Sequence, residues 1–240
     1  EIVFGVAPCL LGLTQGRRSA SCLFVKSGEG PERDAILRVC QEAIRRGVQI
    51  KRVNKQTLEK MCDGKVHQGL CLQASCLGFI KEERPITSLE VKNQRPLWLV
   101  LDGVQDPMNL GAILRSAYYL GVDRIVSSIN NSCPLTPTVS KASAGVMEVM
   151  DVFGCSNLKR MIKVWKLTAL VHFSVCPEEG IIAFIYTVYA NVFVCMLSGG
   201  EGDGLSSELR QLCDVLITIP PRRHMHPGVE SLNVSVATGM

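Results

Sequence analysis

Short apolar runs that alternate with helical patterns restrict the fold of this chain more than any other feature of its sequence. A continuous apolar run is typical of a strand buried on both faces of a sheet. Strand–helix alternation is typical of a mainly parallel sheet covered by helices on both faces, so the sequence predicts an α/β fold. The expected strands are Leu97–Leu101, Asp123–Ser128, Val192–Leu197 and Val215–Ile219.

The segments between these strands carry helix signals. Gly121 follows the periodic stretch 108–121 as a C-cap residue, and a last helix is expected to start near Leu232. Two further helices are predicted over Pro137–Met150 and Ser206–Leu212.

The first 80 residues predict a second, smaller α/β unit. The expected strands are Ala20–Val25, Val48–Val53 and Leu70–Ser75, and the expected helices are Lys55–Met61 and a longer one from Pro31 to Gly47. Residues 81–96 are charged, carry two prolines and are typical of a linker. The predicted organisation is therefore a domain at 1–80, a linker at 81–96 and a domain at 97–240.

Charge differs between the two predicted domains. Residues 1–96 contain 16 Lys+Arg and 10 Asp+Glu, a net charge of +6, whereas residues 97–240 contain 10 and 12, a net charge of −2. A basic front half indicates an anion-binding module, for which nucleic acid is the commonest partner. An ordinary solvated basic face remains the alternative.

The 11 cysteines and 4 histidines do not form a metal or disulfide pattern. The cysteine number is odd, no Cys-x-x-Cys pair occurs, and the closest spacing is from Cys71 to Cys76. His224 and His226 lie two residues apart without a nearby cysteine partner. We therefore expect a reducing compartment and no metal site.

Residues 181–198 contain no charged side chain. A length of 18 residues reaches the threshold for a membrane span. Thr187, Asn191 and two tyrosines interrupt the run, and no cluster of Lys and Arg flanks it, so two buried strands are favoured and no membrane contact is expected.

Polar residues follow the predicted strands, where open α/β sheets bind their ligands. Asn109 and Arg115 lie six residues apart on the helix after Leu97–Leu101, with Gly111 between them. For Asn109, the alternative to a functional role is capping of the helix. Arg115 lies on an otherwise packed surface, where an arginine needs an anionic partner. Glu148, in the second helix, is a lone carboxylate for which packing is the favoured interpretation.

The loop GGEGDG at 199–204 differs from known phosphate-binding loops. Leu205 stands where a P-loop has its lysine, and Glu201 and Asp203 would repel phosphates. An acidic loop with close backbone approach suits a ligand with hydroxyls and positive charge, such as S-adenosyl-L-methionine.

Taken together, the motifs resemble those of one family. The order N-L-G-A-I-L-R, K-A-S-A-G-x-x-E, G-x-E-G-x-G-L-S, I-P and E-S-L-N-V-S-V-A-T-G is similar to the SpoU/TrmH branch of the SPOUT RNA 2′-O-ribose methyltransferases. The likeness covers about 95–155 and 197–240, and residues 1–80 resemble the family's L30e-like substrate-binding domain. It implies a SPOUT α/β domain with a trefoil knot, a homodimer, and RNA bound across both subunits.

The resemblance also implies site residues. A catalytic group would contain Asn109, Arg115, Glu201, Ser231 and Asn233. The cofactor S-adenosyl-L-methionine would be bound by Gly199, Gly200, Gly202, Ile219 and Leu232.

The likeness is greatest to members that modify a guanosine of mitochondrial large-subunit rRNA. It implies rRNA as partner and a place in the mitochondrial matrix, with the targeting segment absent from this chain. Two alternatives remain open: a tRNA 2′-O-methyltransferase, and an RNA-binding domain with an inactive site. The second alternative arises because residues 163–196 do not resemble the family and the C-terminus is short.

Overall fold

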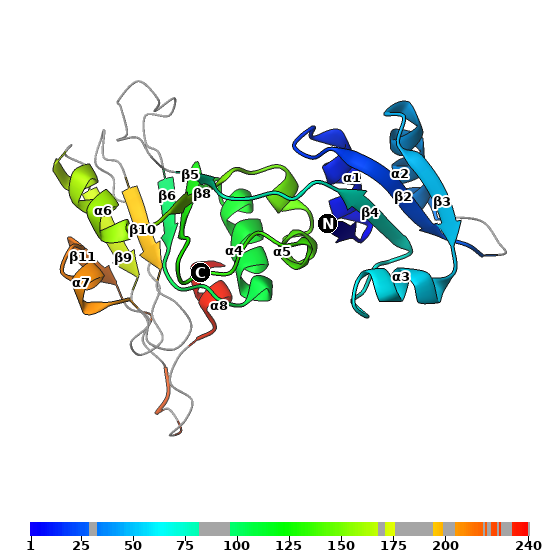
Figure 1. Cartoon of the computed structure of the whole chain (residues 1–240). Coiled ribbons are helices and arrows are strands. Elements are labelled where there is room, and N and C mark those ends of the chain that lie inside the picture. The colour runs from blue at the N-terminus through cyan, green and yellow to red at the C-terminus, as the bar shows by residue number, and fades with distance from the viewer. Residues whose placement is uncertain are drawn as a thin grey trace. The chain divides into compact units, whose positions relative to one another are not determined.

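The chain, seen here as a computed structural model, divides into two compact units (Figure 1). Unit 1 is Glu1–Gly78 with Leu135–Met150, and unit 2 is Phe79–Pro134 with Asp151–Met240. The structure describes residues 1–28, 33–81, 97–167, 171–175, 194–198, 205–217, 219, 222–224, 226 and 232–239. The linker expected at 81–96 lies almost wholly outside these ranges, so its boundaries stay a prediction.

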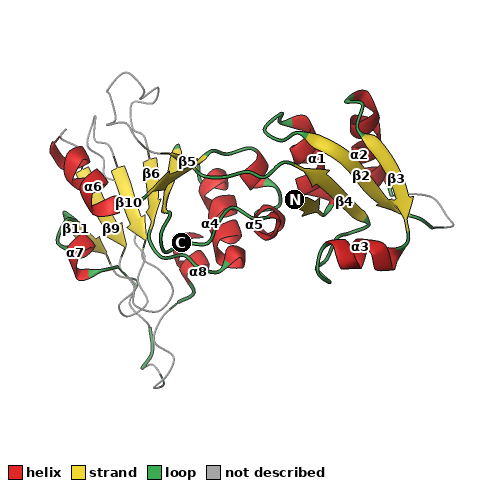
Figure 2. Ribbon diagram, viewed as in Figure 1, coloured by secondary structure: helices red, strands yellow, loops and turns green. Residues whose placement is uncertain are grey.

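Unit 1 is a four-stranded sheet with helices on its faces (Figure 2). The strand order is β1-β4-β2-β3, with β4 antiparallel to β1 and β2, and β3 parallel to β2. The strands are β1 (Ile2–Phe4), β2 (Ala20–Lys26), β3 (Gln49–Val53) and β4 (Leu70–Ala74), and the first three helices are α1 (Val6–Thr14), α2 (Asp34–Arg45) and α3 (Lys55–Met61).

The strands and helices predicted between residues 20 and 75 are confirmed, with ends shifted by a few residues. No sequence pattern predicts β1 or α1. β1 has only three residues, and α1 (VAPCLLGLT) is apolar almost all round, so it shows no amphipathic period. Leu13 and Cys9 of α1 pack with Leu23 and Leu72 in the core of the unit.

The single helix predicted over Pro137–Met150 is wrong. Helix α5 ends at Ala142 (Pro137–Ala142), and a short 3₁₀ turn, η1, follows at Val146–Glu148. Ala144 (φ 52°) and Gly145 (φ 88°) are left-handed, which a continuous helix forbids. A Cβ on Gly145 would lie 2.7 Å from Leu11 Cδ1, so glycine allows this turn to pack closely against α1.

Glu148 is fully buried in unit 1 and paired with a buried arginine. Arg18 donates from Nε to Oε2 at 2.6 Å and from Nη2 to Oε1 at 3.0 Å, and Ser140 Oγ donates to Oε1 at 2.6 Å. Arg18 also donates to the Ser75 carbonyl at 2.6 Å and pairs with Glu1. These bonds join the segment Leu135–Met150 to a part of the chain more than a hundred residues earlier.

Unit 2 is built on a seven-stranded sheet in which all neighbouring strands are parallel. The strand order is β11-β9-β10-β6-β7-β8-β5. The strands are β5 (Ile80–Lys81), β6 (Leu97–Leu101), β7 (Arg124–Ser128), β8 (Val152–Cys155), β9 (Val171–Val175), β10 (Val194–Ser198) and β11 (Val215–Ile217). The helices are α4 (Pro107–Tyr119), α6 (Leu158–Leu167), α7 (Ser207–Arg210) and α8 (Val234–Gly239). The predicted parallel α/β class is confirmed.

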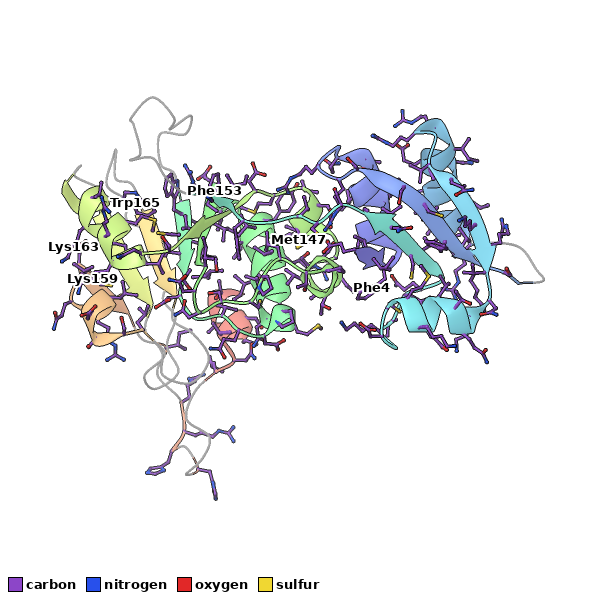
Figure 3. All side chains as sticks on the ribbon, viewed as in Figure 1. Phe4, Met147, Phe153, Lys159, Lys163 and Trp165 are labelled. Atoms are coloured by element: carbon purple, nitrogen blue, oxygen red, sulfur yellow. The ribbon has the colours of Figure 1, made fainter. Side chains whose placement is uncertain are left out.

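Aromatic side chains hold α6 on the sheet of unit 2. Trp165 of α6 meets Trp98 of β6 edge to face, with ring centroids 5.1 Å apart. The Arg124 guanidinium lies 3.7 Å from the centre of the Phe153 ring and 4.7 Å from that of Trp98. Figure 3 labels Trp165 and Phe153 in this region.

The uncharged run at 181–198 is described only at its end, where Val194–Ser198 forms β10. Residues 181–193 lie outside the described part of the chain. None of the helices in the described part is long and apolar enough to cross a membrane.

We expect Glu148→Ala to destabilise unit 1 strongly, because it leaves the Arg18 guanidinium buried without its main carboxylate. Loss of one partner of a buried pair costs about 3–5 kcal/mol of the free energy of unfolding. Urea unfolding followed by circular dichroism measures this loss of stability. Tryptophan fluorescence is not suitable for unit 1, because both tryptophans belong to unit 2. Glu42→Ala, which removes the partner of the exposed Arg45, is the control and should barely move the midpoint. Equal effects of the two substitutions would contradict the role given to Glu148.

Candidate active site at the carboxyl edge of the parallel sheet

The strand order of unit 2 reverses direction between β6 and β10. From β6 the chain adds β7 and β8 on one side, and β9, β10 and β11 then lie on the other side. Ligands of open α/β sheets bind outside the carboxyl ends of strands at such a switch point. The register pairs Ser198 with Leu101, so β10 and β6 end side by side (Figure 2).

Hydrogen bonds fix the loop that follows β6. Asn131 Nδ2 donates to Asp102 Oδ1 at 2.8 Å, and the Cys133 amide donates to the Val104 carbonyl at 2.9 Å. The Gly103 amide donates to Ser128 Oγ at 3.3 Å. The loops after β6 and β7 therefore support each other at this edge of the sheet.

Helix α4 begins at this edge and is capped by Asp106. The Asp106 carboxylate accepts from the Met108 amide at 2.9 Å, and Pro107 occupies the first turn. The capping role considered for Asn109 is therefore wrong. Asn109 lies within the helix, and its side chain is half-buried and turned to another element.

Asn109 meets Asn233, which lies 124 positions later in the sequence. Asn233 Nδ2 donates to Asn109 Oδ1 at 3.0 Å. Asn233 Oδ1 accepts from the Ser235 amide at 2.9 Å and from Ser235 Oγ at 2.6 Å, so the same side chain caps α8. Both ends of the Asn233 amide are held, which orients it at the first turn of α4.

Helix α8 packs on α4. A Cβ added to Gly239 would lie 3.4 Å from Ser116 Oγ, so the end of α8 also lies against α4. Arg115, one residue before Ser116, is exposed. The pair Asn109–Asn233 and the guanidinium of Arg115 are thus carried by one two-helix element.

The remaining predicted site residues divide into two groups. Ile219 is half-buried two residues after β11, and Leu232 is 40% exposed beside Asn233. Ile219 therefore follows the end of a strand, and Leu232 lies just before α8. Gly199, Gly200, Glu201, Gly202 and Ser231 lie outside the described residues, so their roles stay predictions.

Sequence reasoning missed the residues that support this edge. Ser128 ends a predicted strand and Asn131 follows it, but their partners Gly103 and Asp102 belong to a different loop. The sequence signal that could have found them is the cluster of polar residues at the end of the predicted strand Asp123–Ser128. In the described part of the chain, no three His, Cys, Asp or Glu side chains gather as a metal site.

Comparison with known proteins assigns the chain to a family. Residues 96–240 match the model of the SpoU rRNA Methylase family, and residues 2–77 match the model described as RNA 2′-O ribose methyltransferase substrate binding. A parallel α/β sheet whose strand order reverses, together with this set of motifs, defines the class of protein. The chain belongs to the SpoU rRNA methylase family.

Curated relatives extend the match over both units. The chain is 41% identical to human "rRNA methyltransferase 1, mitochondrial", over 100% of this chain and 70% of that protein. It is 36% identical to the "23S rRNA (guanosine-2'-O-)-methyltransferase RlmB" of Xanthomonas campestris, over 88% of this chain and 82% of the relative.

Solved structures share the fold. An RNA 2′-O ribose methyltransferase superposes with a TM-score of 0.72 at 21% identity, over 99% of this chain and 84% of the other. An AdoMet-bound rRNA methyltransferase from Sinorhizobium meliloti gives 0.69 at 20% identity, over 99% and 83%. The SPOUT methyltransferase fold expected from the sequence is confirmed.

A double-mutant cycle tests the Asn109–Asn233 contact. Asn109→Ala and Asn233→Ala should couple by about 0.5–1.5 kcal/mol in the free energy of unfolding, the net contribution of one hydrogen bond. Tryptophan fluorescence during urea unfolding follows unit 2. Asn130 bonds to the Ser156 carbonyl instead, so Asn109→Ala and Asn130→Ala should be additive. Additivity in the Asn109–Asn233 cycle would show that the hydrogen bond contributes nothing.

Proposed function

We propose that this chain transfers a methyl group from S-adenosyl-L-methionine to the 2′-hydroxyl of a guanosine ribose in mitochondrial large-subunit rRNA. The observation that carries the proposal is the 41% identity to a human mitochondrial rRNA methyltransferase along the whole chain. The relatives named as guanosine-2′-O-methyltransferases support the ribose 2′-oxygen as the methylated atom and guanosine as the nucleotide. The name of the human relative supports the organelle.

Two of the predicted cofactor-binding residues have side chains that suit the cofactor. Leu232 leaves two-fifths of its apolar surface uncovered beside Asn233, and Ile219 is half-buried just beyond β11. Apolar side chains and backbone groups at a carboxyl edge suit an adenine ring and a ribose. When bound, S-adenosyl-L-methionine supplies an electrophilic methyl group whose sulfonium leaves as a neutral thioether. Leu232 and Ile219, with the loop at 199–202, would hold it.

Methyl transfer to a hydroxyl is an in-line displacement in which positioning matters most. With the cofactor bound, its methyl carbon would pass to the ribose O2′ with loss of the neutral thioether, and the hydroxyl proton would pass to solvent water. The Arg115 guanidinium is positively charged and carries only hydrogen-bond donors, so it offers no acceptor for the hydroxyl proton. We assign it to stabilise the developing negative charge on O2′ and to hold a flanking phosphate. Asn109, Asn233 and Ser231 set the geometry, and Glu201 belongs to the same group.

The exposed face of α4 supports assembly as a homodimer. Met108 is 56% exposed and Tyr119 is 89% exposed, and both share a helical stripe with Arg115. Val236 of α8, a neighbouring helix, is 51% exposed. Apolar side chains around a functional arginine are typical of a surface that a second copy covers. RNA would then contact both subunits.

We also propose that the backbone of unit 2 is knotted. β10 follows β9 in sequence but lies between β9 and β6, and α8 returns to pack on α4. This return of the C-terminal segment across the first helix of the sheet supports a trefoil knot, a rare exception to the rule that chains do not thread loops.

Labelled methyl transfer to unmodified large-subunit rRNA, followed by mapping of the modified ribose, tests the activity. We expect a methylated guanosine 2′-oxygen and little transfer to tRNA. Arg115→Ala should lose most of this transfer while its affinity for S-adenosyl-L-methionine, measured by calorimetry, stays unchanged. Near-normal turnover would remove Arg115 from the mechanism. Absence of cofactor binding by the folded wild type would instead favour an inactive RNA-binding domain.

The oligomeric state is tested on the α4 face. Met108→Glu with Tyr119→Glu should convert a dimer to monomers, because the charges would be buried between the copies. Light scattering measures the mass. Ile44→Glu, at a 69% exposed position of unit 1, should keep the dimer. A dimer that survives the double substitution would place the interface elsewhere.

A further inference from the structure

Unit 1 contains a pocket that the methyl-transfer site does not use. Its volume is about 660 Å³, and every described lining residue belongs to unit 1. The end of β2, the first turn of α2, helix α3 and the loop Gly64–Gly69 form its walls. This volume lies within the roughly 300–1,000 Å³ typical of pockets that enclose small ligands.

The charged side chains among the described lining residues are mainly basic. Lys26, Arg33, Lys55 and Lys65 contribute cations, and Glu59 is the only carboxylate among them. Lys55 Nζ lies 3.1 Å from Glu59 Oε1, and Lys65 Nζ donates to Thr138 Oγ1 at 3.0 Å. Lys26 and Arg33 are exposed, so their charges are presented to solvent at the pocket. Two such cations favour a phosphate group.

His67 lies in the pocket wall and is held in one orientation. Its side chain is largely buried, and Nδ1 accepts the Gly69 amide at 3.0 Å. Burial lowers the pKa of His67, and Lys55 and Lys26 act in the same direction against an opposite effect of Glu59. The ring is therefore neutral near pH 7 and carries its proton on Nε2.

The loop Gly64–Gly69 is held in an uncommon conformation. Gln68 is left-handed (φ 56°), and so is Gly69 (φ 91°). Gln68 Oε1 accepts from Lys141 Nζ at 2.6 Å and from the Val6 amide at 3.1 Å, so its conformation is fixed by neighbours in unit 1. At this loop Val66 leaves 73% of its surface exposed, an apolar side chain beside the cations.

We propose that this pocket binds an unpaired nucleotide of the RNA substrate, with a phosphate at Lys26 and Arg33 and the base against Val66. The proposal rests on the proposed function, because it takes RNA as the substrate. A concave pocket admits a nucleotide that is turned out of a helix, whereas a duplex presents its phosphates on a convex surface. Proteins that read RNA commonly target such unstacked nucleotides in loops. The RNA substrate-binding family model over residues 2–77 covers the pocket but does not say where RNA sits.

Binding of two labelled RNAs to the full chain tests the proposal. One is a hairpin with an unpaired loop taken from the methylated region, and the other is a fully paired duplex of equal length. Lys26→Ala with Arg33→Ala should weaken hairpin binding about tenfold or more. It should also reduce the slope of log K against log salt by about 0.7 for each phosphate that the two cations no longer neutralise.

Val66→Ala should weaken hairpin binding and leave the salt slope unchanged, since an apolar contact releases no counterions. Arg38→Ala is the control for loss of charge outside the pocket, because it removes one positive charge from an exposed position of α2 that does not line the pocket. It should change hairpin binding less than twofold. Duplex binding should respond equally weakly to the pocket and control substitutions.

The outcomes separate this proposal from the proposed function. If the wild type methylates rRNA but the pocket variants bind the hairpin like Arg38→Ala, the pocket proposal is overturned and the activity stands. If the wild type methylates no rRNA yet the pocket variants lose hairpin binding, the pocket stands and the activity fails. Equal losses for hairpin and duplex would show a general anion surface and overturn the nucleotide pocket.

Discussion

The pairing of β10 with β6 is the interaction on which unit 2 depends. β10 is inserted between β6 and β9, in register from Val194–Leu97 to Ser198–Leu101. This pairing creates the reversal of strand order and brings the end of β10, which directly precedes the glycine-rich sequence, beside the end of β6. Helix α4 begins at the same edge. A one-residue slip of this register would change which residues of the two strands end together at this edge.

Unit 1 depends on a different kind of interaction. The buried Arg18–Glu148 pair stabilises little in itself, because desolvation of both charges offsets their attraction. It specifies one arrangement instead, since either partner alone would be buried without compensation. The ion pair therefore fixes where the K-A-S-A-G-x-x-E segment lies in unit 1, a role that packing considerations for Glu148 did not predict.

The two proposed sites differ in how many cations they present and in which uncharged side chains accompany them. At the sheet edge, helices α4 and α8 carry an exposed arginine and two asparagines that are uncharged and joined by a hydrogen bond. In unit 1, the pocket presents lysine and arginine around a neutral histidine and an exposed valine. The first arrangement suits a reaction at one ribose oxygen, and the second suits the holding of a nucleotide. Recognition and chemistry are thereby assigned to separate units.

Local sequence patterns were enough to establish the parallel α/β class, most strands and helices, and the motif set that identifies the family, because these follow from short-range periodicity and local composition. The contact of Asn109 with Asn233, the break in the helix after Ala142 and the burial of Glu148 by Arg18 emerged only from the folded chain. Each depends on residues that lie far apart in the sequence or on close packing at one glycine. Periodicity carries no information on which distant segments meet, so only the packing of strands and helices in space settles it.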